Sequence, residues 1–183
     1  MNITLHNKRF NYTRTHWFEG IRIYDIRKRI KIPAAFQRGV VKCRVVYSQE
    51  IEDIEFSFYE LRKIQSIRAV ECSHLEYFFK FEDRSGIHQC LEQVETSDEI
   101  LILRNGRITD TSYCNVAFSK NNLWYTPSNP LLPGVMRRKL IENGKILPEN
   151  LALDDLRNYT HIALFNALIP FGKLVLPVSS IDF

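Results

Sequence analysis

An Asn-Gly pair at positions 105 and 106 constrains the fold of this chain more than any other feature of its sequence. The pair follows an apolar run at 100–103 and precedes a second stretch that suits a β-strand. Both residues can adopt positive φ, which a two-residue hairpin turn requires. Residues 97–115 are therefore predicted to form a hairpin around which the rest of the chain is organised.

Polar residues beyond this turn indicate a binding site. Asp110 lies four residues after Gly106, and Asn115 lies five residues after Asp110. Further along, Gly134 opens a helical pattern, and the first amides of a helix have no acceptor within it. An inward carboxylate and free helix amides could together bind a ligand with a cationic ring and a phosphate. Each signal also has a simpler interpretation, because Asp110 could be a turn residue and many helices begin at glycine.

Composition narrows the class of protein. Hydrophobic residues make up 45% and charged residues 25% of 183 positions, which indicates one large or two small globular domains. The net charge of +4 comes without a sustained basic face, so nucleic-acid binding is disfavoured. The chain has no apolar run of about 18 residues and no signal-like start, so we predict no membrane span and a cytoplasmic location.

The cysteines and histidines do not suggest a metal site. The four cysteines are widely separated, and their apolar surroundings favour buried free thiols over disulfides: Cys43, Cys72, Cys90 and Cys114. The five histidines are scattered, so no metal is predicted. The sequence also lacks the phosphate-binding loop, the dinucleotide-binding glycine pattern and the common hydrolase motifs.

Hydrophobic periodicity predicts an α+β chain in two parts, 1–73 and 74–183. The first part is a small α/β lobe, with helices expected at 6–18 and 24–30 and strands at 39–48, 51–58 and 66–72. The second part is larger and contains the hairpin, with helices expected at 83–94, 134–143 and 153–159 and further strands at 115–119, 123–125, 161–169 and 173–178.

Two basic residues are candidates for chemistry. Lys80 is flanked by phenylalanines at 78, 79 and 81. Burial there would disfavour the ammonium and make a neutral amine available for a Schiff base. The alternative is an exposed lysine on the solvent face of a strand. Arg9 follows His6 by three positions in the first predicted helix, where it could bind a phosphate or simply face solvent.

Taken together, these elements resemble the class IV aminotransferase family, the fold type IV pyridoxal-phosphate enzymes, in both order and spacing. The resemblance runs from residue 6 to about 178. The matching elements are HxxR at 6–9, the KxxxR of the lyase branch at 80–84, the Asp-Glu, strand, acid and Asn pattern at 98–115, Thr-Pro at 126–127, the Leu-x-Gly-x-x-Arg type element at 132–137 and Asn-Ala-Leu at 166–168.

The resemblance implies a two-lobed, D-amino acid aminotransferase-like fold with a shortened N-terminal lobe, pyridoxal 5'-phosphate in the cleft and a homodimer. It implies that Lys80 is the catalytic residue that forms the Schiff base, and that Asp110 keeps the pyridine nitrogen protonated. The other cofactor-binding residues that it implies are Arg9, Asn115, Val135, Met136, Asn166 and Ala167.

The KxxxR and Asn-Ala-Leu elements favour the lyase branch. Its small-molecule substrate would be 4-amino-4-deoxychorismate, and its products 4-aminobenzoate and pyruvate, as in folate biosynthesis. The alternatives are a class IV aminotransferase for a small or branched-chain amino acid, and a degenerate homologue that binds no cofactor. The chain departs from the family in having Asp110 where Glu is usual, and in having HxxR almost at residue 1.

Overall fold

The computed structural model describes residues 2–94 and 96–183, and it is an α+β structure, as the sequence predicts. The chain forms two compact units, Met1–Leu61 and Arg62–Phe183. The boundary predicted from the sequence was residue 73, so residues 62–73 belong to the second unit instead. The reason is the strand β3 (Ile67–Glu71), which pairs in parallel with β4 (Glu99–Arg104) of the second unit.

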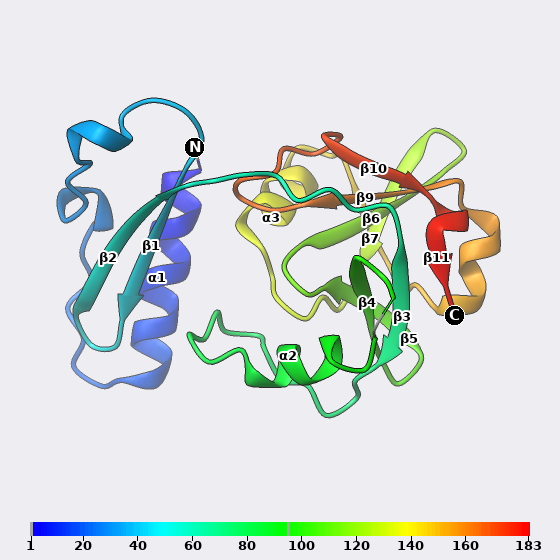
Figure 1. Ribbon diagram of the computed structural model, residues 1–183. Coiled ribbons are helices and arrows are strands. Elements are labelled where there is room, and N and C mark those ends of the chain that lie inside the picture. Colours follow the sequence, from blue (N-terminus) through cyan, green and yellow to red (C-terminus); the bar gives the residue numbers. More distant parts are fainter. Residues whose placement is uncertain (1, 95) are drawn as a thin grey trace. The chain divides into compact units, whose positions relative to one another are not determined.

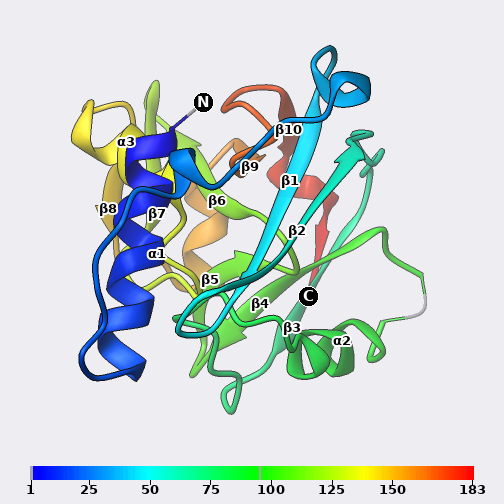
Figure 2. The same cartoon turned by 90° about the vertical axis from the view of Figure 1, so that its left-hand side faces the viewer.

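The first unit is a helix with a two-stranded sheet. It contains α1 (Ile3–Trp17), the short 3-10 helices η1 (Ile26–Lys28) and η2 (Ala34–Phe36), and the strands β1 (Val41–Tyr47) and β2 (Ile51–Phe58). The two strands pair antiparallel, and they run side by side in both views (Figures 1 and 2). The helix predicted at 24–30 is only the 3-10 turn η1. Phe10 of α1 is buried between the rings of Tyr24 and Tyr47.

A buried arginine anchors α1 within this unit. The side chain of Arg14 is fully buried, and its guanidinium donates to the carbonyl oxygens of Gln49 and Arg22. It also lies over the rings of Phe10 and Tyr24, 4.9 and 4.4 Å from their centroids. Cation–π contact and carbonyl acceptors replace water around the charge, which is what a buried guanidinium requires.

The second unit is built on a sheet of nine strands (Figure 1). The main path runs in the order β10-β9-β6-β5-β4-β3-β11, and β7 joins β6 to β8 beside that path. The remaining strands are β5 (Arg107–Thr111), β6 (Asn115–Lys120), β7 (Leu123–Pro127), β8 (Leu147–Glu149), β9 (His161–Phe165), β10 (Leu174–Pro177) and β11 (Ile181–Asp182).

The hairpin that organises the sequence is confirmed. Strands β4 and β5 pair antiparallel, and Asn105 and Gly106 between them both have positive φ, 52° and 69°. These angles match a type I′ turn, whose twist suits the strands that it joins. Because β4 and β5 lie in the middle of the sheet, this local turn determines where the residues after it are placed.

Helices of the second unit cover apolar residues of the sheet. They are α2 (Ser85–Leu91), α3 (Val135–Glu142) and the 3-10 helices η3 (Leu153–Asn158) and η4 (Val178–Ser180). Ile87 of α2 packs in a core cluster with Ile100 and Ile102 of β4. Leu140 of α3 packs in a second cluster with Phe165 of β9. Among the described residues, no helix is long and apolar enough to cross a membrane.

The expectation of four buried free thiols is wrong. Cys72 and Cys90 are fully buried, as their apolar neighbours suggest, but they form a disulfide between the end of β3 and α2. Cys114 is a buried free thiol and Cys43 is an exposed one. The pairing could not be inferred from the sequence, because it depends on the packing of α2 against the sheet.

Candidate functional site

Three neighbouring strands of the second unit bring the predicted polar residues together. Asp110 lies directly opposite Asn115 in the β5–β6 pair. Asn115 in turn lies opposite Phe165 in the β6–β9 pair, and Asn166 follows Phe165. The side chains of Asp110, Asn115 and Asn166 therefore come from adjacent positions at one end of β5, β6 and β9.

Asp110 is a buried carboxylate with two defined partners. Its side chain is 4% exposed. One oxygen, Oδ1, accepts a hydrogen bond from Asn115 Nδ2 at 2.7 Å, and the other, Oδ2, accepts from the backbone amide of Leu132 at 2.7 Å. Burial raises the pKa of Asp110 to about 7, although these hydrogen bonds and the nearby guanidinium of Arg137 favour the ionised form. A cation beside this carboxyl would stabilise its charged state.

Asn115 links the hairpin to the segment that precedes α3. Its Nδ2 also donates to the carbonyl oxygen of Leu132 at 2.8 Å. Its Oδ1 lies so close to Gly134 that a Cβ added there would be 1.9 Å from it. Gly134 has an ordinary φ of −66°, so glycine is needed for this close approach and not for its backbone angle. The start of α3 is therefore held next to Asp110.

Arg137 attaches α3 to the end of β7. Arg137 is buried, and it donates from Nη2 to the carbonyl oxygen of Pro127 at 2.7 Å and from Nε to Thr126 Oγ1 at 3.3 Å. Burial lowers the pKa of Arg137. Gly134 has no side chain with which to cap the helix, so in the described part of the chain the helix start that carries Val135 and Met136 can present amides to an anion.

Asn166 shapes the turn that follows β9. Its Oδ1 accepts from the amides of Leu168 and Ile169 at 2.8 and 3.0 Å. Its Nδ2 donates to the carbonyl oxygen of Tyr113, in the turn between β5 and β6, at 3.3 Å. The Asn166 side chain thus makes hydrogen bonds to backbone groups of the protein itself. The next residue, Ala167, is exposed.

Lys80 does not have the buried environment that its neighbours in sequence suggested. It is exposed, and it lies in an irregular segment between β3 and α2. Phe78 and Phe81 beside it are 51% and 41% exposed. The desolvation argument is therefore wrong. The alternative is confirmed in that Lys80 is exposed, but it is wrong in placing Lys80 on a strand. Lys80 remains a candidate for its position in the KxxxR element.

Arg84, at the end of the same segment, is a functional candidate that the sequence reasoning did not single out. Its Nη2 donates to the carbonyl oxygen of Ser112 at 2.7 Å. Ser112 lies in the turn between Asp110 and Asn115, so the segment that carries Lys80 is attached to the candidate site. Its place four residues after Lys80 was the only sign of this role in the sequence.

Arg9 belongs to the first unit, on α1, where it is partly buried. The other predicted residues belong to the second unit, and a role for Arg9 in binding a phosphate stays a prediction.

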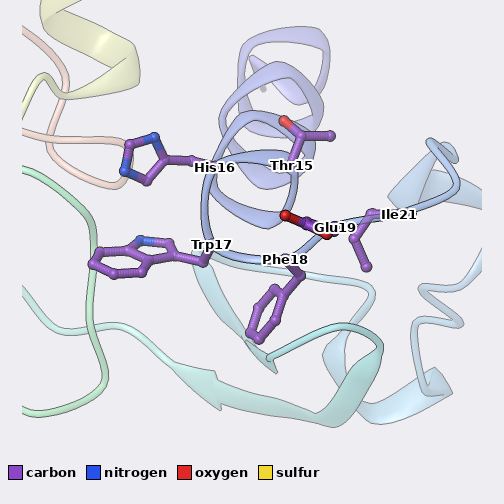
Figure 3. Close-up of a pocket in the computed structure, with 7 residues that line it drawn as sticks. Thr15, His16, Trp17, Phe18, Glu19 and Ile21 are labelled. Carbon is purple, nitrogen blue, oxygen red and sulfur yellow. The ribbon is translucent and has the colours of Figure 1, made fainter.

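The hollow seen in Figure 3 lies elsewhere, at the end of α1. It has a volume of about 510 Å³ and is lined by residues 15–21. The side chains of His16 and Trp17 extend to one side of the helix end, and those of Glu19 and Ile21 to the other. Binding sites usually have polar groups that converge, so this hollow is a weaker candidate than the strand ends. Among the described residues, no three His, Cys, Asp or Glu side chains form a possible metal site.

Sequence comparison places the chain in a family. The model of the amino-transferase class IV family matches residues 88–181. An uncharacterised protein of Haemophilus influenzae is 32% identical over 169 residues, which are 91% of this chain and 90% of that protein. The chain belongs to the class IV aminotransferase family. Members of this family depend on pyridoxal phosphate and act on small molecules.

Solved structures agree with this family assignment. A provisionally named 4-amino-4-deoxychorismate lyase of Haemophilus somnus 129pt is 32% identical, with a TM-score of 0.82 over 92% of this chain and 89% of that one. A provisionally named amino-acid aminotransferase of Mesorhizobium loti has a TM-score of 0.81 over 100% of this chain and 92% of its own, and at 17% identity it shows the fold alone. A provisionally named aminodeoxychorismate lyase of Schizosaccharomyces pombe is 38% identical over 87 residues, 45% of this chain and 38% of that protein.

Proposed function

We propose that this protein is a pyridoxal-phosphate-dependent lyase that releases 4-aminobenzoate and pyruvate from 4-amino-4-deoxychorismate. The observation that carries the proposal is the buried carboxylate of Asp110, bracketed by Asn115 and Leu132 beside the uncapped start of α3. The choice of a lyase over an aminotransferase is supported by the KxxxR and Asn-Ala-Leu elements and by the names of the relatives from Haemophilus somnus and Schizosaccharomyces pombe.

The residues of the site fit the cofactor. An ionised carboxylate has about four acceptor positions, and Asn115 and the backbone at Leu131 and Leu132 use no more than three of those on Asp110, so it can still accept a hydrogen bond from a pyridinium. A positively charged ring would also favour the ionised state that burial disfavours. The first turn of α3, at Val135 and Met136, suits the phosphate. Arg9 of the first unit is proposed as a further phosphate ligand.

When bound, pyridoxal phosphate supplies an electron sink for the carbanion that forms at the substrate Cα. Lys80 is proposed as the amine that binds the cofactor and that removes and returns the proton at Cα. Asp110 is proposed to hold negative charge at the pyridine nitrogen, so that this nitrogen keeps its proton. Asn115 and Asn166 keep the Asp110 carboxylate and the adjoining turns in position.

Product analysis tests this proposal. Purified protein with pyridoxal phosphate is incubated with 4-amino-4-deoxychorismate, and 4-aminobenzoate and pyruvate are measured separately. Equal amounts of the two products would support the lyase. Amino-group transfer from a branched-chain amino acid to 2-oxoglutarate, with no pyruvate, would instead indicate an aminotransferase. Protein that neither binds the cofactor nor forms any product would be a degenerate homologue.

Assembly and location are proposed from the family resemblance. We propose a cytoplasmic homodimer, and light scattering coupled to size-exclusion chromatography would test the dimer. A mass that corresponds to a single 21.6 kDa chain over a wide concentration range would contradict it.

A further inference from the structure

The turn between Asp110 and Asn115 is held by side chains from distant parts of the second unit. Ser112 donates its amide to Glu99 Oε1 at 3.1 Å, and Glu99 is fully buried. The carbonyl oxygen of Tyr113 accepts from Asn166 Nδ2 at 3.3 Å. A short turn would ordinarily leave such groups to water, so their capture by protein side chains gives this turn one conformation.

Arg84 completes this set of contacts. Its Nη2 donates to the carbonyl oxygen of Ser112. The backbone of Ser112 is therefore held on both sides, by the Glu99 carboxylate at its amide and by the Arg84 guanidinium at its carbonyl. Hydrogen bonds from a charged donor are roughly twice as strong as neutral ones. Arg84 also directly precedes α2, and its Nε is buried with no hydrogen-bond partner among residues 2–94 and 96–183. Arg84 is half-buried as a whole, and its Nε and the Nη2 that donates to Ser112 are directed at the protein.

The chain connects this contact to Lys80. Four residues can span at most about 14 Å, so an anchored Arg84 limits how far Lys80 can move from the Ser112 turn. On the other side of the contact, Ser112 is only two residues from Asp110. The first half of the segment between β3 and α2 is attached to β4, because the Cys72 amide donates to the Leu103 carbonyl oxygen at 2.9 Å and Leu75 and Tyr77 pack in the core cluster of β4. Arg104 of β4 also forms a surface ion pair with Glu76 of this segment. Arg84 attaches the other end of the segment, beyond Lys80, to the Ser112 turn.

We infer that Arg84 is a positioning residue, which holds the Lys80 segment against the Ser112 turn so that the amine can reach a ring bound at Asp110. The inference rests on the proposed use of pyridoxal phosphate and does not depend on which reaction follows. A lysine at position 84 could donate one hydrogen bond to the Ser112 carbonyl, but it lacks the rigid planar group of arginine.

Two forms of the cofactor test the inference. The Lys80 amine can add to the aldehyde carbon of pyridoxal phosphate, with loss of water, whereas pyridoxamine phosphate has no aldehyde and cannot form this bond. Dissociation constants for both are measured by titration with the wild type, Arg84→Gln, Arg84→Lys and Arg104→Gln. Thermal unfolding of each variant confirms that it is folded.

If Arg84 positions Lys80, Arg84→Gln weakens binding of pyridoxal phosphate at least about tenfold and changes that of pyridoxamine phosphate by less than about twofold. Arg84→Lys recovers part of the loss, and Arg104→Gln leaves both constants unchanged. Equal loss for both cofactors would mean that Arg84 binds the phosphate or supports the whole site, and no loss for either would mean that it is not needed. Either result overturns the inference. Protein that binds both forms but makes no pyruvate would contradict the lyase proposal alone.

Discussion

Replacing Asp110 with asparagine separates two consequences of the buried carboxylate. The two groups that face it, Asn115 Nδ2 and the Leu132 amide, are both donors. Asparagine has one side-chain oxygen, so its NH₂ group would face one of these donors and leave it without an acceptor. A buried donor without a partner costs about 1–3 kcal/mol, and we expect Asp110→Asn to lower the free energy of unfolding by this amount at acidic pH.

The second consequence depends on pH. Burial raises the pKa of Asp110 to about 7 in the folded chain, from an ordinary value of 3.8. The folded chain therefore holds this proton more tightly than the unfolded chain does between these two values. The stability that it contributes is fully present below about pH 4 and is lost as the pH rises toward 7. The whole effect is at most about 4 kcal/mol, because one pKa unit corresponds to about 1.4 kcal/mol.

Urea unfolding of cofactor-free protein at pH 5, 6, 7 and 8 measures both effects. The free energy of unfolding of the wild type should fall relative to that of Asp110→Asn as the pH rises to 7, far enough to reverse their order, and the difference should change little above pH 7. Saturating pyridoxal phosphate should remove this pH dependence, because a cationic ring keeps Asp110 ionised. Turnover of Asp110→Asn should fall at least about tenfold, or about 1.4 kcal/mol of transition-state stabilisation. Parallel stability curves at all four pH values would refute the assignment of a raised pKa.

Three further changes test other parts of the site. Gly134→Ala should destabilise the chain by about 1–3 kcal/mol in thermal unfolding, because its Cβ would strike Asn115 Oδ1; in an Asn115→Ala background the cost should nearly vanish. Borohydride reduction of cofactor-loaded protein should label Lys80, and peptide mapping should show the label lost in Lys80→Ala but kept in Lys63→Ala. Arg9→Ala should weaken cofactor binding by about 1.5–3 kcal/mol in a direct titration, and an unchanged affinity would exclude a phosphate contact.

The features that the sequence predicted well depend on local chemistry. Asn105 and Gly106 formed the expected turn because their positive φ angles are a property of the two residues themselves. The hairpin then carried Asp110 into the sheet, and a fixed spacing along two strands brought Asn115 opposite to it. This pairing was not predicted from the sequence, because it depends on a second turn, at 112–114, that sets the register of β5 and β6.

The features that it predicted poorly depend on contacts between distant segments. The boundary at Leu61 follows from the parallel pairing of β3 with β4, which no local pattern records. The exposure of Lys80 shows that apolar neighbours do not by themselves bury a residue, since the segment that holds them can remain at the surface. The contact of Arg84 with Ser112 spans 28 positions of the chain, and the residues around each of them contain no pattern that would predict the contact.

The outer strands of the nine-stranded sheet have a consequence for how copies of this protein can associate. At the two ends of the main path lie β11, with two residues, and β10, with four residues ending in Pro177. Beside the path, β8 has three residues with Pro148 in the middle. Very short edge strands and edge prolines offer few unpaired amides to a neighbouring molecule, and they oppose the end-to-end joining of sheets that leads to aggregates. We therefore expect the nine-stranded sheet to end within its own chain and not to be extended by the same sheet of a second copy.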